Sequence, residues 1–205
     1  MNDDGYLKFE SIFSKNHDDR DVLEFSIELR RYIPSAEESI STVAALKGFL
    51  VQAGYLPEMD DEWYFEIFDM RSAHAMEAFG ILTNAQQMLR RALKARMPLD
   101  ECEAIAHLER VWVDPSHRGK GIALRLMREA QHVLGRAGLL VIMKGHPDGG
   151  EVSDSDCLRL SKYYQSDKRL GFVSVSKRRY PGWLVAVWEE PIAYDGDDVL
   201  LLEQA

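Results

Sequence analysis

Apolar and polar residues alternate along much of the first half of the chain, a spacing that is typical of strands with one buried face. In the first such segment the apolar residues Leu23, Phe25 and Ile27 stand at every second position, and Pro34 marks its end. Residues 1–20 are polar and lack a clear period, which predicts a loosely attached N-terminal arm. Strands are expected at residues 22–33, 42–52 and 63–67.

The segment 72–97 has a helical composition. Alanine, methionine, leucine, glutamine and arginine dominate it, proline is absent, and Gly80 is its only glycine. We expect one broken helix or two short ones. Because a direct passage between strands is expected at this point, the segment is a candidate helical insertion.

The second half of the chain alternates strands and helices more clearly. Residues 119–137, before Gly138, carry apolar side chains at the i, i+3, i+4 and i+7 spacing of a helix with one buried face. Residues 139–143 are continuously apolar, as in a strand that is covered on both faces. Asp156 is the expected N-cap of a last helix. That helix is expected at 156–165, and further strands at 104–113, 172–175 and 183–188. This order predicts an α/β (α+β) fold with a mixed sheet and helices on its faces.

Length and composition fit one globular domain. The chain has 205 residues, of which 46% are hydrophobic and 29% charged, and we place the domain at 21–205. No apolar run approaches the roughly 20 residues that cross a bilayer. The N-terminus is acidic where a signal peptide is basic, and Cys102 and Cys157 give no disulfide framework. These features predict a cytoplasmic protein without a membrane partner.

The net charge of −9 argues against one class of partner. Binding to nucleic acid depends largely on phosphate neutralisation by Lys and Arg, so we expect no nucleic-acid partner. The acidic surface fits ordinary solubility, and it also fits attraction of a cationic acceptor.

The segment with the most specific chemistry is Val111–Ala123, Val-Trp-Val-Asp-Pro-Ser-His-Arg-Gly-Lys-Gly-Ile-Ala. A buried strand ends within it, and a loop with Gly119 and Gly121 leads into the long helix. Glycines let the backbone approach a ligand closely. The first N–H groups of a helix have no partner within it and point outward, together with the positive end of the helix dipole. The segment therefore predicts an anion site suited to a pyrophosphate, with Arg118 and Lys120 adding charge at its rim.

Two common glycine-rich loops do not match this segment. A Walker loop needs Lys and then Ser or Thr after its last glycine, but Gly121 is followed by Ile122. A dinucleotide fingerprint needs a third glycine where Leu124 stands. The pattern Arg/Gln-x-x-Gly-x-Gly/Ala does match, at Arg118, Gly121 and Ala123. With the preceding Val-Asp-Pro, the segment resembles the CoA-binding motif of the GNAT superfamily of acyl-CoA N-acyltransferases.

The resemblance is firm over residues 109–143 and extends more loosely to Trp188. Family members commonly carry a tyrosine on the last helix, a few residues before a Gly-Phe pair that opens the next strand. Tyr164 and the pair Gly171-Phe172 match this order, but the spacing between them is longer than usual. The loop between them is therefore altered.

The resemblance implies a mostly antiparallel sheet in which one parallel pair of strands, around Val111 and Leu140, splays apart to hold acetyl-CoA. Backbone groups at the strand end would bind the pantetheine arm, and the glycine loop would bind the pyrophosphate. The cofactor-binding residues expected on this basis are Trp112, Val113, Arg118, Gly119, Lys120, Gly121, Ile122 and Ala123. Acetyl-CoA is the expected co-substrate. No metal is expected, because no Cys, His or carboxylate cluster has the spacing of metal ligands.

Acetyl transfer to an amine needs a hydrogen-bond donor for the thioester carbonyl and an acid for the departing thiolate. The backbone N–H of Val113 is the expected donor. Tyr164 is the expected acid, because its hydroxyl reaches from the helix toward the splayed strands, and Tyr163 is the alternative.

The amine also needs a base to accept its proton. Glu109 is the expected base, since glutamates at this place serve as base in some members of the family. Glu103 and His107 share its strand face because even steps separate the three positions. His107 is a second candidate, because the pKa of a histidine ordinarily lies near the operating pH.

The favoured function is an N-acetyltransferase that transfers the acetyl group of acetyl-CoA to a primary amine of a small molecule by direct attack. The alternatives are a protein or peptide N-acetyltransferase and a non-catalytic CoA-binding interaction module. The acceptor pocket is expected within residues 54–97, and a homodimer is left open. Candidates to line that pocket, or to be ordinary core, are Met59, Trp63, Tyr64, Met70, Met76 and Met88.

Overall fold

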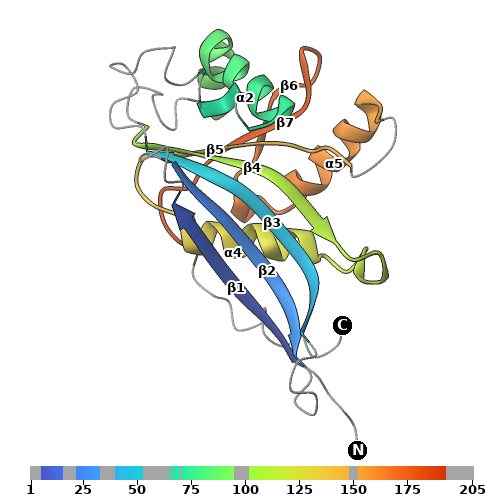
Figure 1. Ribbon diagram of the computed structural model, residues 1–205. Coiled ribbons are helices and arrows are strands. Elements are labelled where there is room, and N and C mark those ends of the chain that lie inside the picture. The colour runs from blue at the N-terminus through green and yellow to red at the C-terminus, as the bar shows by residue number, and fades with distance from the viewer. Residues whose placement is uncertain are drawn as a thin grey trace, which may run out of the picture.

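The computed structural model describes residues 6–15, 22–32, 40–52, 65, 67–69, 71–94, 102–147 and 152–192. These residues contain a seven-stranded sheet with the strand order β1-β2-β3-β4-β5-β7-β6 (Figure 1). β4 and β5 are parallel, and the other neighbouring strands are antiparallel. The strands are β1 (Tyr6–Lys15), β2 (Val22–Tyr32), β3 (Ile40–Gln52), β4 (Ala104–Val113), β5 (Leu139–Lys144), β6 (Val173–Ser176) and β7 (Tyr180–Val187).

Helices cover both faces of the sheet, and α4 and α2 lie on opposite sides of it (Figure 1). The predicted fold class, a mixed sheet with helices on both faces, is confirmed. No helix among the described residues is both long and apolar enough to cross a bilayer. The helices are α2 (Ala73–Asn84), α3 (Gln86–Leu93), α4 (Ile122–Leu134) and α5 (Asp154–Ser166), with the short 3-10 turns η3 (Pro115–His117) and η4 (Lys168–Leu170).

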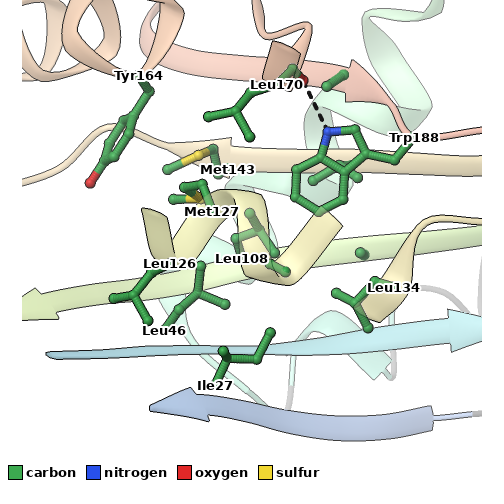
Figure 2. Packing of buried hydrophobic residues seen from close by; sticks show 14 of the residues in the cluster. Ile27, Leu46, Leu108, Leu126, Met127, Leu134, Met143, Tyr164, Leu170 and Trp188 are labelled. Carbon is green, nitrogen blue, oxygen red and sulfur yellow. Dashed lines mark hydrogen bonds between the residues drawn. The ribbon is translucent and has the colours of Figure 1, made fainter. Parts of the chain in front are cut away.

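The first apolar cluster lies between the sheet and α4, with α5 at its edge (Figure 2). Every third or fourth residue of α4 is buried in it, as the helical periodicity predicts. Trp188, after β7, lies in the cluster and its indole Nε1 donates a hydrogen bond of 3.0 Å to the carbonyl of Leu170. Members labelled in Figure 2 include Ile27, Leu46, Leu108, Leu126, Met127, Leu134, Met143 and Tyr164.

The second apolar cluster lies on the opposite face, under α2 and α3. Ala75, Ala78 and Ile81 of α2 pack in it together with Phe49 of β3 and Trp183 of β7. Polar side chains close its edge next to the end of β5, where one carboxylate joins three elements. Oε2 of Glu77 on α2 lies 2.6 Å from Nζ of Lys144 on β5 and accepts a hydrogen bond of 3.1 Å from Nε1 of Trp183. The Glu77 contacts thus hold α2, which lies between β3 and β4 in the chain, against this face of the sheet.

Two expectations for the first half of the chain are wrong. Residues 6–15, expected within a loose arm, form the edge strand β1 and pair with β2 along its whole length. Most of its side chains are exposed or half-buried, so it shows little hydrophobic alternation although its backbone is paired. Phe65 and Ile67, expected within a strand, are helical, as are Phe68 and Asp69. Ile67 and Phe68 are adjacent and both buried, a pattern that a half-buried strand does not allow.

Three helix boundaries also differ from those expected. The break in the segment 72–97 falls at Ala85, while Gly80 lies inside α2. α4 ends at Leu134 with Gly135 as its C-cap, whereas Gly138, with φ of 72°, shapes the turn into β5. The N-cap of α5 is Ser153, not Asp156; the two residues form a capping box in which each side chain bonds the backbone of the other.

A bulge in β4 changes the side of the sheet that its residues face. The register with β3 shifts between Leu108 and Arg110, so Glu109 has no partner in β3. Before the bulge, even-numbered residues such as Leu108 pack in the first cluster, and after it Val111 and Val113 pack there. Without the extra residue, strand alternation would turn those two valines to the opposite face.

Gly48 of β3 lies opposite the start of the bulge, where the two backbones approach closely. A Cβ atom at this position would lie 2.2 Å from the carbonyl oxygen of His107 and 2.8 Å from the ring of Phe25. Both distances are far shorter than contacts that real Cβ atoms make, so only glycine fits without a shift of the backbone.

The parallel pairing of β4 with β5 ends where the bulge begins. The register runs from Ala104–Leu139 to Leu108–Met143. β4 then continues to Val113, while β5 ends at Lys144. The predicted splayed pair is therefore the β4–β5 pair, and the strands separate at its carboxyl end.

Candidate active site

A cavity of about 500 Å³ lies beside this separation, between β4, the start of α4 and α5. Its walls come from three segments that are separated in the sequence, 111–123, 146–147 and 159–164. The wall residues are Val111, Val113, His117, Arg118, Gly119, Gly121, Ile122, Ala123, His146, Pro147, Arg159, Leu160, Tyr163 and Tyr164. We refer to this cavity as the donor pocket.

The phosphate-binding end expected from the sequence forms one wall of the donor pocket. Gly119 and Gly121 adopt φ angles of 79° and 76°, in the left-handed region that favours glycine. No atom lies within 4 Å of a Cβ placed on either residue, so the space in front of both is open. Gly121 is the N-cap of α4 and offers no side chain to its first N–H groups. An open helix N-terminus with Arg118 beside it has the geometry expected of an anion site.

The backbone of Val113 is directed toward the gap between the separated strands. The N–H of Asp114 donates to the carbonyl of Val43 at 2.9 Å and therefore points toward β3. Backbone groups of successive strand residues point in opposite directions, so the N–H and carbonyl of Val113 point away from β3. Nε of Arg118 donates to this carbonyl at 3.0 Å. The Val113 N–H therefore lies on the side of β4 where a thioester carbonyl between the strands would need a donor.

Tyr163 and Tyr164 both reach the donor pocket, from different depths of α5. Tyr164 is 4% exposed and belongs to the first apolar cluster, with its ring near Met143 and Met127 in Figure 2. Tyr163 is 36% exposed, and its hydroxyl hydrogen-bonds the backbone of Leu124 in the first turn of α4. Burial raises the pKa of Tyr163. Tyr163 is thus bonded to the first turn of α4, while Tyr164 lies in the buried interior.

Comparison with known proteins agrees with this geometry. Residues 52–149 match the family model described as Acetyltransferase (GNAT) family, a range that includes β4, the glycine loop, α4 and β5. The matched part of the chain, slightly less than half of it, is therefore similar to the GNAT family. Among solved structures, arylalkylamine N-acetyltransferase 2 from Aedes aegypti is similar at 15% identity, with a TM-score of 0.37. That similarity covers 73% of this chain and 57% of the other. No curated protein matches the chain.

Glu109 lies on the α2 side of the sheet and is not part of the donor pocket wall. Its Oε1 accepts a hydrogen bond of 3.2 Å from the hydroxyl of Ser72, the N-cap of α2. Burial raises the pKa of the Glu109 carboxyl, while the Ser72 hydrogen bond and the nearby Arg71 oppose the rise. The bulge therefore presents a half-buried carboxylate beside the separated strands, on the face opposite to Tyr164.

The structure does not favour His107 as the base. Its side chain is 1% exposed and packs among the rings of Phe49, Phe68 and Trp183. Burial lowers the pKa of His107 to about 3, with smaller contributions in the same direction from the nearby His74 and Arg71. Its Nδ1 has no hydrogen-bond partner among the described residues. His107 is a neutral core residue at physiological pH.

Some of the other predicted residues line the donor pocket, and others lie elsewhere. Trp112 and Lys120 are not in the pocket wall, and Glu103 lies before β4, at the end remote from the separation. Met76 and Met88 are half-buried against the second cluster. Met59, Trp63, Tyr64 and Met70 lie outside the described residues. The predicted residues that line the pocket are Val113, Arg118, Gly119, Gly121, Ile122, Ala123 and Tyr164.

Sequence reasoning missed His146 and Arg159 as wall residues. His146 had a detectable signal, because it follows β5 directly, and residues just past the carboxyl end of a parallel strand commonly form sites. For Arg159 the sequence offered only its spacing. It stands one turn before Tyr163, so both side chains lie on the same face of α5.

Replacement of His107 by Phe is expected to flatten the acid side of the stability profile. The pKa of His107 is about 3 in the folded protein and about 6.5 in an unfolded chain. Between these values the unfolded chain binds a proton that the native protein does not, so stability is fully present above pH 6.5 and falls as pH decreases toward 3. Wild type should lose about 2 kcal/mol from this group between pH 7 and pH 5. Urea unfolding at both pH values measures this loss, and parallel pH dependences for the two proteins would contradict the assignment.

Proposed function

We propose that this protein is an N-acetyltransferase that transfers the acetyl group of acetyl-CoA to a primary amine of a small molecule by direct attack. The observation that carries the proposal is the donor pocket at the separated end of β4 and β5. An open helix N-terminus lies at one end of that pocket, and a buried tyrosine lies in its interior.

The pocket wall fits the parts of acetyl-CoA in a definite order. The turn at Gly119 and Gly121 leaves open space in front of backbone N–H groups, as a pyrophosphate requires. Arg118 adds charge beside them. The gap next to Val113 would receive the pantetheine arm and the thioester. Acetyl-CoA supplies an acyl group on a thiolate leaving group, and the remaining chemistry belongs to residues of the chain.

We assign three roles around the thioester. The Val113 N–H donates to the carbonyl oxygen as negative charge develops on it. The Tyr164 hydroxyl protonates the departing sulfur. Glu109 accepts a proton from the incoming ammonium group, because its carboxylate is half-buried on the other face of the sheet. Donor and acceptor would then meet at the separation from opposite faces.

Other parts of the proposal rest on the sequence. We propose that one domain contains the whole site; β1 is part of its sheet, so the domain includes residues before position 21. The segment 72–97 remains a proposed insertion, and its helices pack against the sheet face where Glu109 lies. The composition supports a cytoplasmic location.

Replacement of Gly121 by Ala is expected to abolish stabilisation by acetyl-CoA. The new methyl group would occupy the space in front of the helix N-terminus, and the positive φ would cost roughly 1–2 kcal/mol of stability. Gly171→Ala is the matched control, since Gly171 also has a positive φ (66°) and open space but lies outside the donor pocket. Acetyl-CoA at about 100 times its Kd should stabilise wild type and the control by roughly 2.7 kcal/mol. Equal shifts in Tm for the two variants would refute the phosphate assignment.

Replacement of Tyr164 by Phe is expected to lower kcat by about 10²–10⁴-fold while leaving acetyl-CoA affinity intact. The change removes the acid and almost no volume from a buried side chain. Tyr163→Phe should lower kcat far less, because that hydroxyl is bonded to the backbone of Leu124. Steady-state rates of CoA release with a panel of amines provide the measurement. A larger defect for Tyr163→Phe would exchange the two assignments.

Replacement of Glu109 by Gln is expected to lower turnover most at neutral pH. Wild-type activity should rise as the carboxyl ionises, at a pH above its ordinary range because burial raises its pKa. The defect of the variant should shrink as the pH approaches the amine's own pKa of about 10.4, where solution provides the free amine. Glu103→Gln, at the remote start of the same strand, is the control. A defect that is constant with pH would mean that Glu109 holds the acceptor or the strand.

A further inference from the structure

His146 joins the donor pocket to the opposite face of the sheet. It follows β5 directly and lines the pocket together with Tyr163 and Tyr164. Its ring also packs on the ring of His74 in the first turn of α2, with a centroid distance of 4.7 Å and an angle of 56° between the planes. His146 is exposed, and His74 is half-buried. Two imidazoles thus stand in contact at the separated strands, one of them in the pocket wall.

The surroundings of His74 disfavour its protonated form. Burial lowers the pKa of His74, and the nearby Lys144 and His146 lower it further, against an opposing effect of Glu77. A neutral imidazole can accept a proton, and two imidazoles in contact do not readily accept one each. Titratable and charged groups facing the pair are Glu77 on α2, Lys144 on β5, His107 on β4, His117 and Arg118 before α4, and Arg159, Tyr163 and Tyr164 on α5.

We propose that His146 is a second proton acceptor in the acetyl transfer and that His74 positions it. This inference rests on the proposed function. An ammonium acceptor must lose two protons to become an amide. Glu109 takes the first, before attack. As the N–C bond forms, the amine nitrogen carries a positive charge, and its second proton passes to the neutral imidazole of His146.

The remaining steps return each group to its starting state. The C–S bond breaks, and the departing thiolate takes the proton of Tyr164. His146, in the same pocket wall, returns its proton to the tyrosine oxygen, directly or through water. Glu109 releases its proton to solvent. The net change is one ammonium and one thioester converted to one amide, one thiol and one proton, so the protons balance.

Replacement of His146 by Gln is expected to lower kcat by about 10²-fold or more, with acetyl-CoA stabilisation unchanged. The acid limb that an imidazole gives to the pH–rate profile should disappear. His74→Phe keeps an aromatic partner for the His146 ring but removes the neighbouring imidazole, so the acid limb should shift. His132→Gln, on the last turn of α4 and outside the pocket, is the control and should retain wild-type kcat.

NMR titration of the ring nitrogens tests the pair without turnover. The pKa of His74 should rise in His146→Gln, because the charge of its neighbour is gone. An unchanged His74 titration, or wild-type kcat and pH profile in His146→Gln, would overturn the inference while leaving the proposed function intact. A wild-type protein that acetylates none of the amines would overturn both.

Discussion

The separation of β4 from β5 is the constraint on which the rest of the site depends. Parallel pairing stops at Leu108, and the bulge at Glu109 follows at once. The bulge changes the alternation, so Val111 and Val113 face α4 and the donor pocket while Glu109 remains on the α2 face. Gly48 permits this arrangement because its missing side chain leaves room for the β4 backbone. One irregularity in one strand therefore directs a backbone donor to the gap and a carboxylate to the opposite side.

Burial assigns different chemistry to the two faces. On the α4 face, Tyr164 is enclosed by apolar side chains of the first cluster. On the α2 face, charged groups have close partners of opposite charge. Glu77 contacts Lys144, and Nη1 of Arg71 lies 3.0 Å from Oε1 of Glu24. His107 lies beneath them as a neutral residue, because solvent does not reach its ring. The paired carboxylate of Glu77 and the neutral imidazole of His107 can thus lie on the same face without forming one charged cluster.

The sequence predicted the second half of the molecule better than the first, for physical reasons. β4, the glycine loop and α4 follow one another directly in the sequence. Gly121 marks the position that needs a positive φ, and Ile122 begins the apolar face of the helix. The edge strand β1 was missed because its side chains are largely exposed and hydrophobic alternation reports burial, not pairing. The contact between His74 and His146 was also out of reach, since it depends on where α2 packs, and periodicity shows only which face of a helix is buried. The bulge has no distinct sequence signal either, because it is defined by the partner strand.

The carboxylate of Glu77 links α2 to two strands of the sheet through Lys144 and Trp183. It stands one helical turn after His74, so its contacts with Lys144 and Trp183 set both the height and the rotation of that part of α2 above the sheet. The spacing of the two imidazole rings follows from this anchorage. A substitution at Glu77 would therefore disturb the contact between His74 and His146. In a screen for inactive variants, Glu77 would then be mistaken for a residue of the proposed reaction, although its contacts are structural.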